Sequence, residues 1–164
     1  MKHFLPVVWC ALVLVGCASS PPTYTSTLDD QYKDGIVSVS LVGLDPDGSP
    51  SPQGLIIQCM NAGTSAVTVQ WEKSTISLGS APHPVFLKYG SYGDPRGAPA
   101  DVNVPAGGRL VETVYPANRV TTMSGGWGPL KLDIQPLGTE RVSLSVSVNV
   151  LGQDRFYTLQ VQVR

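Results

Sequence analysis

Few side chains in this sequence are able to do nucleophilic or metal chemistry, and they are scattered along the chain. The three cysteines are Cys10, Cys17 and Cys59, and the two histidines are His3 and His83. A structural zinc site needs about four such ligands, and the Gly-x-Ser-x-Gly turn of many serine hydrolases does not occur in the sequence. The sequence therefore predicts no catalytic residue, no metal site and no cofactor.

The first 17 residues have the three parts of an export signal. Met1-Lys2-His3 is a short positive start, and Phe4 to Val15 is an uncharged run of 12 residues. A membrane-spanning helix needs about 20 apolar residues, so this run is typical of a cleaved secretory signal. The run ends in Leu14-Val15-Gly16-Cys17. This motif resembles the lipobox of bacterial lipoproteins, with Leu three positions before the cysteine and a small residue directly before it.

The resemblance implies that residues 1–16 are removed as a signal peptide, that the Cys17 sulfur carries a diacylglycerol through a thioether, and that the Cys17 amine is usually acylated, with palmitate-type chains. Each buried CH₂ group adds about 0.8 kcal/mol of membrane binding, so two or three chains anchor a protein firmly. The residue after Cys17 is Ala18 rather than Asp, which in this family favours the outer membrane, facing the periplasm. Residues 17–34 are polar and rich in Pro, Ser and Thr, which predicts a flexible tether. Residues 35–164 remain for one folded domain.

The charge of the chain limits the class of partner that it can bind. Its cysteines limit how the folded domain can be stabilised. The net charge is −1 and no cluster of Lys or Arg occurs, whereas nucleic-acid binding needs concentrated positive charge. Cys59 has no partner for a disulfide once Cys17 is acylated and Cys10 is removed, so a hydrophobic core must stabilise the fold. Cys59 lies in the apolar run Leu55 to Met60, and we expect it to be buried and unreactive.

Alternation of apolar and polar residues dominates the chain from Gly35 onward and predicts strands with one buried face. The clearest runs are 142–150 and 157–163, and no window has a convincing helical stripe. Turn residues at Asn61 to Ser65 and at Leu151 to Asp154 predict two hairpins. The expected strands are 36–43, 54–61, 66–72, 74–79, 84–89, 109–115, 130–135, 141–151 and 154–163.

The expected strands number about eight or nine, and they predict an all-β fold of the antiparallel β-sandwich type. The segment Leu55 to Leu78 resembles the strand pairs of immunoglobulin-like domains, and we expect its Trp71 to be a core aromatic.

Two long irregular segments carry residue types that are common in binding sites. Gly90 to Gly108 contains Tyr92 and Arg96, and Asn118 to Pro129 contains Arg119 and Trp127. Loops beyond about 12–15 residues are usually functional or disordered, and Trp, Tyr and Arg are enriched at binding hot spots. The four side chains form a candidate binding surface. The alternative is that Trp127 folds back and caps the core.

Together these features predict a membrane-anchored envelope lipoprotein that binds rather than catalyses. We expect it to act as a binding or accessory module of a larger envelope assembly, with an envelope protein or a glycan as partner and no nucleic acid. One alternative is an envelope enzyme or an enzyme inhibitor that uses the 90–108 and 118–129 loops. Another is a structural lipoprotein with no specific ligand.

Overall fold

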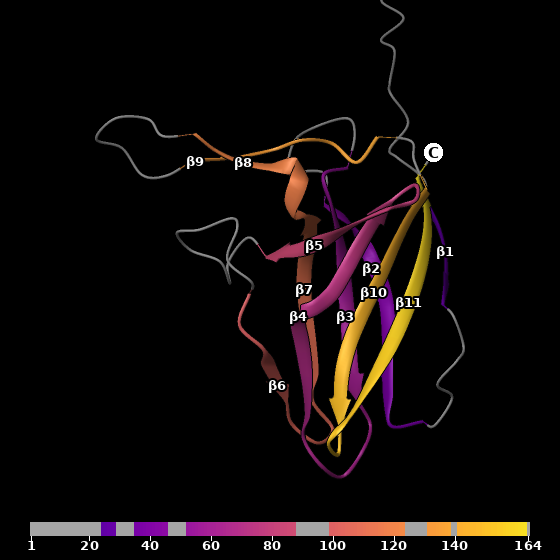
Figure 1. Cartoon of the computed structure of the whole chain (residues 1–164). Helices are drawn as coiled ribbons and strands as arrows, with labels where there is room; N and C mark the ends of the chain where they lie inside the picture. Colours follow the sequence, from indigo (N-terminus) through magenta and orange to yellow (C-terminus); the bar gives the residue numbers. More distant parts are fainter. Residues whose placement is uncertain are drawn as a thin grey trace, which may run out of the picture.

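The computed structural model describes residues 24–28, 35–45, 52–87, 99–123, 131–138 and 141–163, which form strands, their connections and one short 3-10 helix (Figure 1). The strands are β1 (Tyr24–Leu28), β2 (Val37–Asp45), β3 (Gly54–Asn61), β4 (Val67–Leu78), β5 (Ala81–Leu87), β6 (Val102–Val104), β7 (Arg109–Pro116), β8 (Val120–Met123), β9 (Lys131–Ile134), β10 (Arg141–Val150) and β11 (Gln153–Val163), and the 3-10 helix η1 is Ala117–Arg119. Within these ranges no helix has the length and apolar character needed to cross a membrane.

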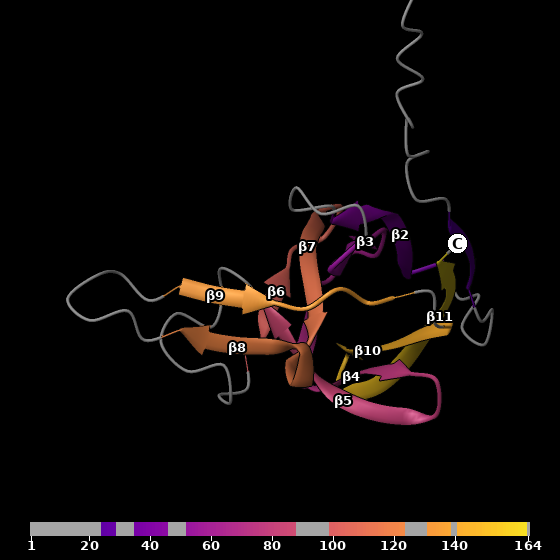
Figure 2. The same cartoon turned by 90° about the horizontal axis from the view of Figure 1, so that it is seen from above.

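Antiparallel pairing arranges most of the strands in two layers around a shared core (Figures 1 and 2). One layer has the order β1-β11-β10-β4, with β6 also paired to β4, and the other has the order β7-β3-β2. The layers are joined by β5, whose first half pairs with β4 and whose residues from Val85 to Leu87 pair with β7. The predicted all-β antiparallel sandwich is therefore confirmed, while the immunoglobulin-like resemblance stays a prediction.

The core is built by the alternation seen in the sequence. Every second residue of β10 from Val142 to Val150 is buried, and the buried positions of β3 face them across the sandwich. Trp71 on β4 is the largest fully buried side chain, as expected for a core aromatic. Cys59 is also buried, among apolar neighbours of the same core.

The connection from Asn61 to Ser65 differs from its prediction. It contains turn residues, but it does not make a hairpin, because β3 and β4 belong to different layers. The Asn61 side chain explains the path, since its Nδ2 donates hydrogen bonds to the carbonyls of Ser65, Val104 and Pro105. These bonds hold the chain at the end of the sandwich while it crosses between layers. The second predicted hairpin is confirmed, because Val150 pairs with Gln153 around the two-residue turn between β10 and β11.

The two strands predicted at 66–72 and 74–79 form the single strand β4, which contains a large bulge. Its pairing with β10 shifts register between Ser145 and Ser147, where Gln70 is opposite Ser147 and Thr75 is opposite Ser145. The buried Ser74 side chain bridges the bulge, because its Oγ accepts a hydrogen bond from the Ser147 N–H and donates one to the Gln70 carbonyl. A side chain thus replaces the missing backbone ladder bond.

Residues 24–28 were expected to be part of the flexible tether 17–34, but they form β1. This strand adds to the edge of β11, with Tyr24 opposite Val163 and Leu28 opposite Leu159. The β-branched Thr25 and the aromatic Tyr24 favour an extended backbone, and the edge of β11 that faces away from β10 is where this strand pairs. The stretch between Cys17 and the first described strand is therefore shorter than the sequence predicted.

A second small hydrophobic cluster supports a hairpin that projects from the sandwich. The hairpin consists of β8 and β9, and in both views it extends sideways from the two layers (Figures 1 and 2). The cluster consists of Phe86, Tyr115, Val120 and Ile134, with Phe86 and Tyr115 ring centroids 6.3 Å apart. The Tyr115 hydroxyl also donates a hydrogen bond to Asp45 Oδ2, which fixes the end of β2 beside this cluster.

Candidate functional site

The structure describes only one of the side chains that the sequence singled out for binding. Cys17, Tyr92, Arg96 and Trp127 lie outside the described residues. Arg119 is half-buried in η1, and its carbonyl accepts a hydrogen bond from Gln135 N at 2.9 Å. The surface formed by Tyr92, Arg96, Arg119 and Trp127 therefore stays a prediction.

The residues capable of nucleophilic or metal chemistry do not form a cluster in the part of the chain that the structure describes. Burial raises the pKa of the Cys59 thiol to about 11, which leaves almost no thiolate at neutral pH. His83 on β5 has its Nε2 3.2 Å from Asn118 Nδ2. No group of three or more His, Cys, Asp or Glu side chains able to hold a metal ion occurs within the described ranges.

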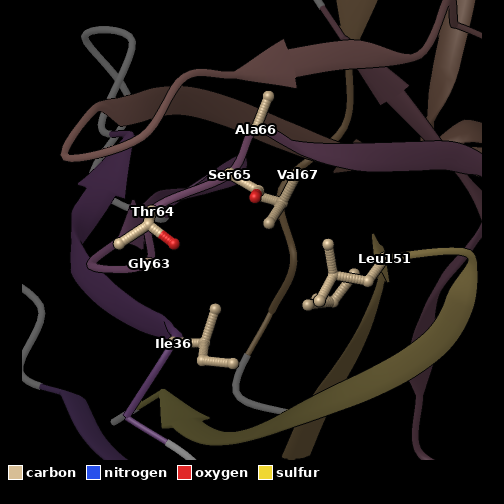
Figure 3. A pocket seen from close by; sticks show the side chains of 8 residues that line it. Ile36, Gly63, Thr64, Ser65, Ala66, Val67 and Leu151 are labelled. Atoms are coloured by element: carbon tan, nitrogen blue, oxygen red, sulfur yellow. The ribbon is translucent and has the colours of Figure 1, made fainter.

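A cavity of about 250 Å³ opens at the end of the sandwich where β3 crosses to β4 and where β10 turns into β11 (Figure 3). Its lining contains no titratable side chain and consists of Ile36, Gly63, Thr64, Ser65, Ala66, Val67, Val150 and Leu151. In the close view the side chains of Ile36, Val67 and Leu151 converge on the cavity. We call it the end pocket.

The floor of the end pocket is continuous with the core, while its wall is exposed. Val67 and Val150 are fully buried, and Ile36 is half-buried. Leu151, by contrast, is 75% exposed, the highest value among the large apolar side chains of the described residues. The pocket therefore joins the buried core to the exposed side chain of Leu151.

Leu151 occupies a backbone position that disfavours it. It has φ 52° and is followed by Gly152 with φ 83°, so both central residues of the hairpin turn are left-handed. Such two-residue turns favour Asn-Gly, and a left-handed L-residue costs about 1–2 kcal/mol. Leu151 therefore combines a largely exposed apolar side chain with an unfavourable backbone conformation.

Hydrogen bonds and an ion pair stabilise the turn that contains Leu151. Asn149 Oδ1 accepts a hydrogen bond from the Gly152 N–H at 3.0 Å, and Asn149 Nδ2 donates to Asp154 Oδ1 at 2.7 Å. Asp154 also pairs with Lys73 at 2.6 Å, which neutralises the charge beside the turn. The hydrogen bond from Lys73 lowers the pKa of Asp154, so this network is charged and intact at neutral pH.

Hydrogen bonds also hold the opposite wall of the end pocket, which contains Ile36 and Gly63. Asn61 Oδ1 accepts from the Gly63 N–H at 3.0 Å, and Ala62 N–H donates to the Ile36 carbonyl at 2.7 Å. A side chain at position 63 would place its Cβ 2.8 Å from Ile36 Cγ2, so only glycine allows this close approach. Both walls are therefore fixed before any ligand arrives, which lowers the entropy lost on binding.

The described lining of the end pocket is uncharged and largely apolar. Pockets for small-molecule ligands usually enclose about 300–1,000 Å³, and the end pocket, at about 250 Å³, lies just below this range. Sequence reasoning missed it because its lining comes from three separate segments, at residues 36, 63–67 and 150–151. The one available signal was a leucine in the first position of a two-residue Leu-Gly turn. Comparison of the chain with protein-family models, curated proteins and solved structures found no match.

Proposed function

We propose that this chain is a lipid-anchored envelope protein that acts as a binding or accessory module for a larger envelope assembly. The observation that carries the proposal is the motif Leu14-Val15-Gly16-Cys17 at the end of a 12-residue uncharged run. Acylation of Cys17 tethers the domain to a membrane, and Ala18 favours the outer membrane. The domain then faces the periplasm.

The fold supports this proposal because the first described strand and the end pocket lie at opposite ends of the sandwich. Tyr24 is seven positions after Cys17, so the chain between them spans at most about 23–25 Å. Tyr24 pairs with Val163 at the last residue of β11, whereas the end pocket lies beyond the first residue of that strand. An 11-residue strand is about 36 Å long. A membrane anchor at Cys17 therefore attaches the domain near the end of the sandwich opposite to the end pocket.

This orientation fits a binding module. In this proposal the end near Tyr24 lies within about 25 Å of the attachment at Cys17, and the end that exposes Leu151 and the end pocket lies at the other end of the sandwich. Preformed apolar sites of this kind are where partner proteins find their anchors.

The test is fractionation of cells that produce the full chain or its Cys17→Ala variant. We expect the natural chain to enter the outer-membrane fraction and to incorporate labelled palmitate. The variant is expected to lose the label and to remain as uncleaved precursor. A Cys10→Ala variant is the matched control and should behave like the natural chain. Palmitate labelling that persists in Cys17→Ala would overturn the proposed anchor.

A further inference from the structure

We infer that β1 is a releasable clasp that decides which end of the sandwich is joined to the membrane anchor. While β1 is paired with β11, the anchor is joined to the end of the sandwich at Val163. When β1 is released, the anchor is joined to the start of β2 at the opposite end. The anchor at Cys17 comes from the proposed function, whereas the pairing of β1 rests on the described strands alone.

The register of β1 sets the attachment point in the paired state. Tyr24 lies opposite Val163 and Leu28 lies opposite Leu159, so the strand meets the fold at the end of β11. β1 lies along the outer edge of β11, near the C-terminus (Figure 1). Seven positions separate Tyr24 from Cys17, which gives a reach of about 23–25 Å.

The start of β2 lies at the other end of the sandwich. Its first residue, Val37, pairs with Asn61, where the chain leaves β3 for β4, and the preceding Ile36 lines the end pocket. Val37 is 20 positions after Cys17, and a stretch of this length reaches about 66–72 Å when it is fully extended. Release of β1 therefore moves the attachment from one end of the sandwich to the other and nearly triples the length of the tether.

The pairing of β1 through one edge allows its release without loss of the two layers. It is the terminal strand of its sheet and, within the described residues, pairs with β11 alone. β11 keeps its pairing with β10 along nearly its whole length, from Gln153 to Gln162. The five residues Tyr24–Leu28 include only one aliphatic side chain, so the strand has little apolar surface to bury. Short terminal elements of this kind open at a lower free energy than the core.

A disulfide between β1 and β11 tests the pairing. Thr27 and Gln160 are directly opposite each other. The Cα atoms of opposed residues in antiparallel strands are about 4.5–5.5 Å apart, within the range that a disulfide spans. The full chain with Thr27→Cys and Gln160→Cys should therefore form an internal cross-link on oxidation, while the buried Cys59 stays reduced. A disulfide-linked dimer in its place would assign β1 to a second copy and would overturn the inference.

Hydrogen exchange of the full chain tests the release. We expect even the slowest amides of residues 25–28 to exchange at least about tenfold faster than those of β10. The oxidised form of the Thr27→Cys and Gln160→Cys variant should remove most of this difference, and its reduced form, the matched control, should not. Equal exchange of β1 and β10 in the natural chain would mean that β1 opens only when the whole domain unfolds, which would refute the clasp.

The change of attachment point is measured by energy transfer on phosphatidylcholine vesicles that contain acceptor lipids and carry the acylated full chain. One fluorescent amino acid replaces the exposed Arg141, which pairs with Gln162 near the end of β11. A second replaces the exposed Gln153, which pairs with Val150 of the end pocket. In the natural chain we expect stronger transfer from position 141 than from position 153. Release of β1 should weaken transfer from both positions and make position 153 the stronger of the two.

The variant that releases β1 combines Thr25→Pro with Ser26→Pro. Alternate residues of an antiparallel strand direct their N–H groups to the partner strand, so two adjacent prolines remove at least one hydrogen-bond donor from the ladder. The matched control combines Thr25→Val with Ser26→Thr, which keeps both N–H groups and suits a strand. This control should behave like the natural chain.

Transfer that remains stronger from position 141 in the proline variant would overturn the inference. A chain that does not stay on the vesicles, or a failure of the Cys17→Ala test, would instead refute the anchor. The cross-link and the hydrogen exchange do not depend on acylation, so they decide on the clasp in either case.

Discussion

Asn61 Nδ2 donates a hydrogen bond to the Val104 carbonyl at 3.0 Å, which joins two segments 43 residues apart in the sequence. Asn61 is 1% exposed, and the same amide also reaches the carbonyls of Ser65 and Pro105. Its Oδ1 accepts from the Gly63 N–H. One buried side chain therefore positions the crossing from β3 to β4 and, with it, one wall of the end pocket.

Replacing Asn61 with alanine should destabilise the protein by about 2–3 kcal/mol. The reason is that the buried Val104 carbonyl loses this donor, as do the part-buried carbonyls of Ser65 and Pro105, and an unsatisfied buried polar group costs about 1–3 kcal/mol. Urea unfolding of the purified protein measures the effect. Asn103→Ala is the control, because Asn103 is exposed and bonds only to Thr68 at the surface; it should change stability by less than about 0.5 kcal/mol. Equal effects of the two variants would contradict the role given to Asn61.

Gly54→Ala should also destabilise the protein, through a steric clash. A Cβ at Gly54 would lie 2.7 Å from two carbons of the Tyr115 ring and 2.9 Å from the Val114 carbonyl oxygen. The ring has no room to move, because it is fully buried against Phe86. Overpacking of this kind costs about 1–3 kcal/mol, which thermal unfolding would detect.

The matched control for Gly54 is Gly43 on the neighbouring strand β2. A Cβ there would lie 3.8 Å from Ile56 Cδ1, which is an ordinary contact. Gly43→Ala should leave the melting temperature nearly unchanged. If both variants melted like the natural chain, the close packing of Tyr115 over Gly54 would not exist in solution.

The sandwich could be predicted from the sequence because each long strand has its own alternation. Strands such as β10 bury every second residue, and this pattern follows from strand geometry alone. That β3 and β4 do not pair could not be predicted, because a turn sequence says where the chain reverses and not which layer it enters. That choice depends on the hydrogen bonds from Asn61 to Val104 and Pro105, which no local pattern reveals.

The sequence did not predict the short strands β6 and β8 or the end pocket, for related reasons. Three residues in β6 and four in β8 are too few for a periodicity to be recognised. The end pocket exists only because Ile36, Val67 and Leu151 meet at one end of the fold. The predicted surface at Tyr92, Arg96 and Trp127 rested on residue type and loop length, which say nothing of where side chains lie.

Cys59 should react with a thiol reagent only after unfolding. Its sulfur lies in the core, and burial raises its pKa to about 11, so both access and thiolate are lacking in the folded state. We expect negligible modification of the folded protein over an hour at pH 7.5 and rapid modification in strong denaturant, followed by absorbance of the released thiol. Rapid reaction without denaturant would mean that β3 opens readily.

Glu112 should make the protein less stable at neutral pH than at mildly acidic pH. It lies on β7 opposite the buried Ile57 and is half-buried, so loss of hydration raises its pKa above the ordinary value of 4.5. Its folded-state pKa therefore exceeds the unfolded-state pKa, and the folded state binds the proton more tightly. By linkage, the contribution to stability is complete below the unfolded pKa and is lost as pH rises through the folded pKa.

Glu112→Gln removes this titration, because glutamine is uncharged at every pH. We expect the variant to be more stable than the natural chain at pH 7, and we expect the difference to vanish below about pH 4. Glu72→Gln on the exposed face of β4 is the control and should leave the pH dependence nearly unchanged. Thermal unfolding of the three proteins between pH 4 and pH 8 makes the comparison. A Glu112→Gln protein that is less stable than the natural chain at pH 7 would show that the carboxylate makes a favourable contact, and the argument from lost hydration would fail.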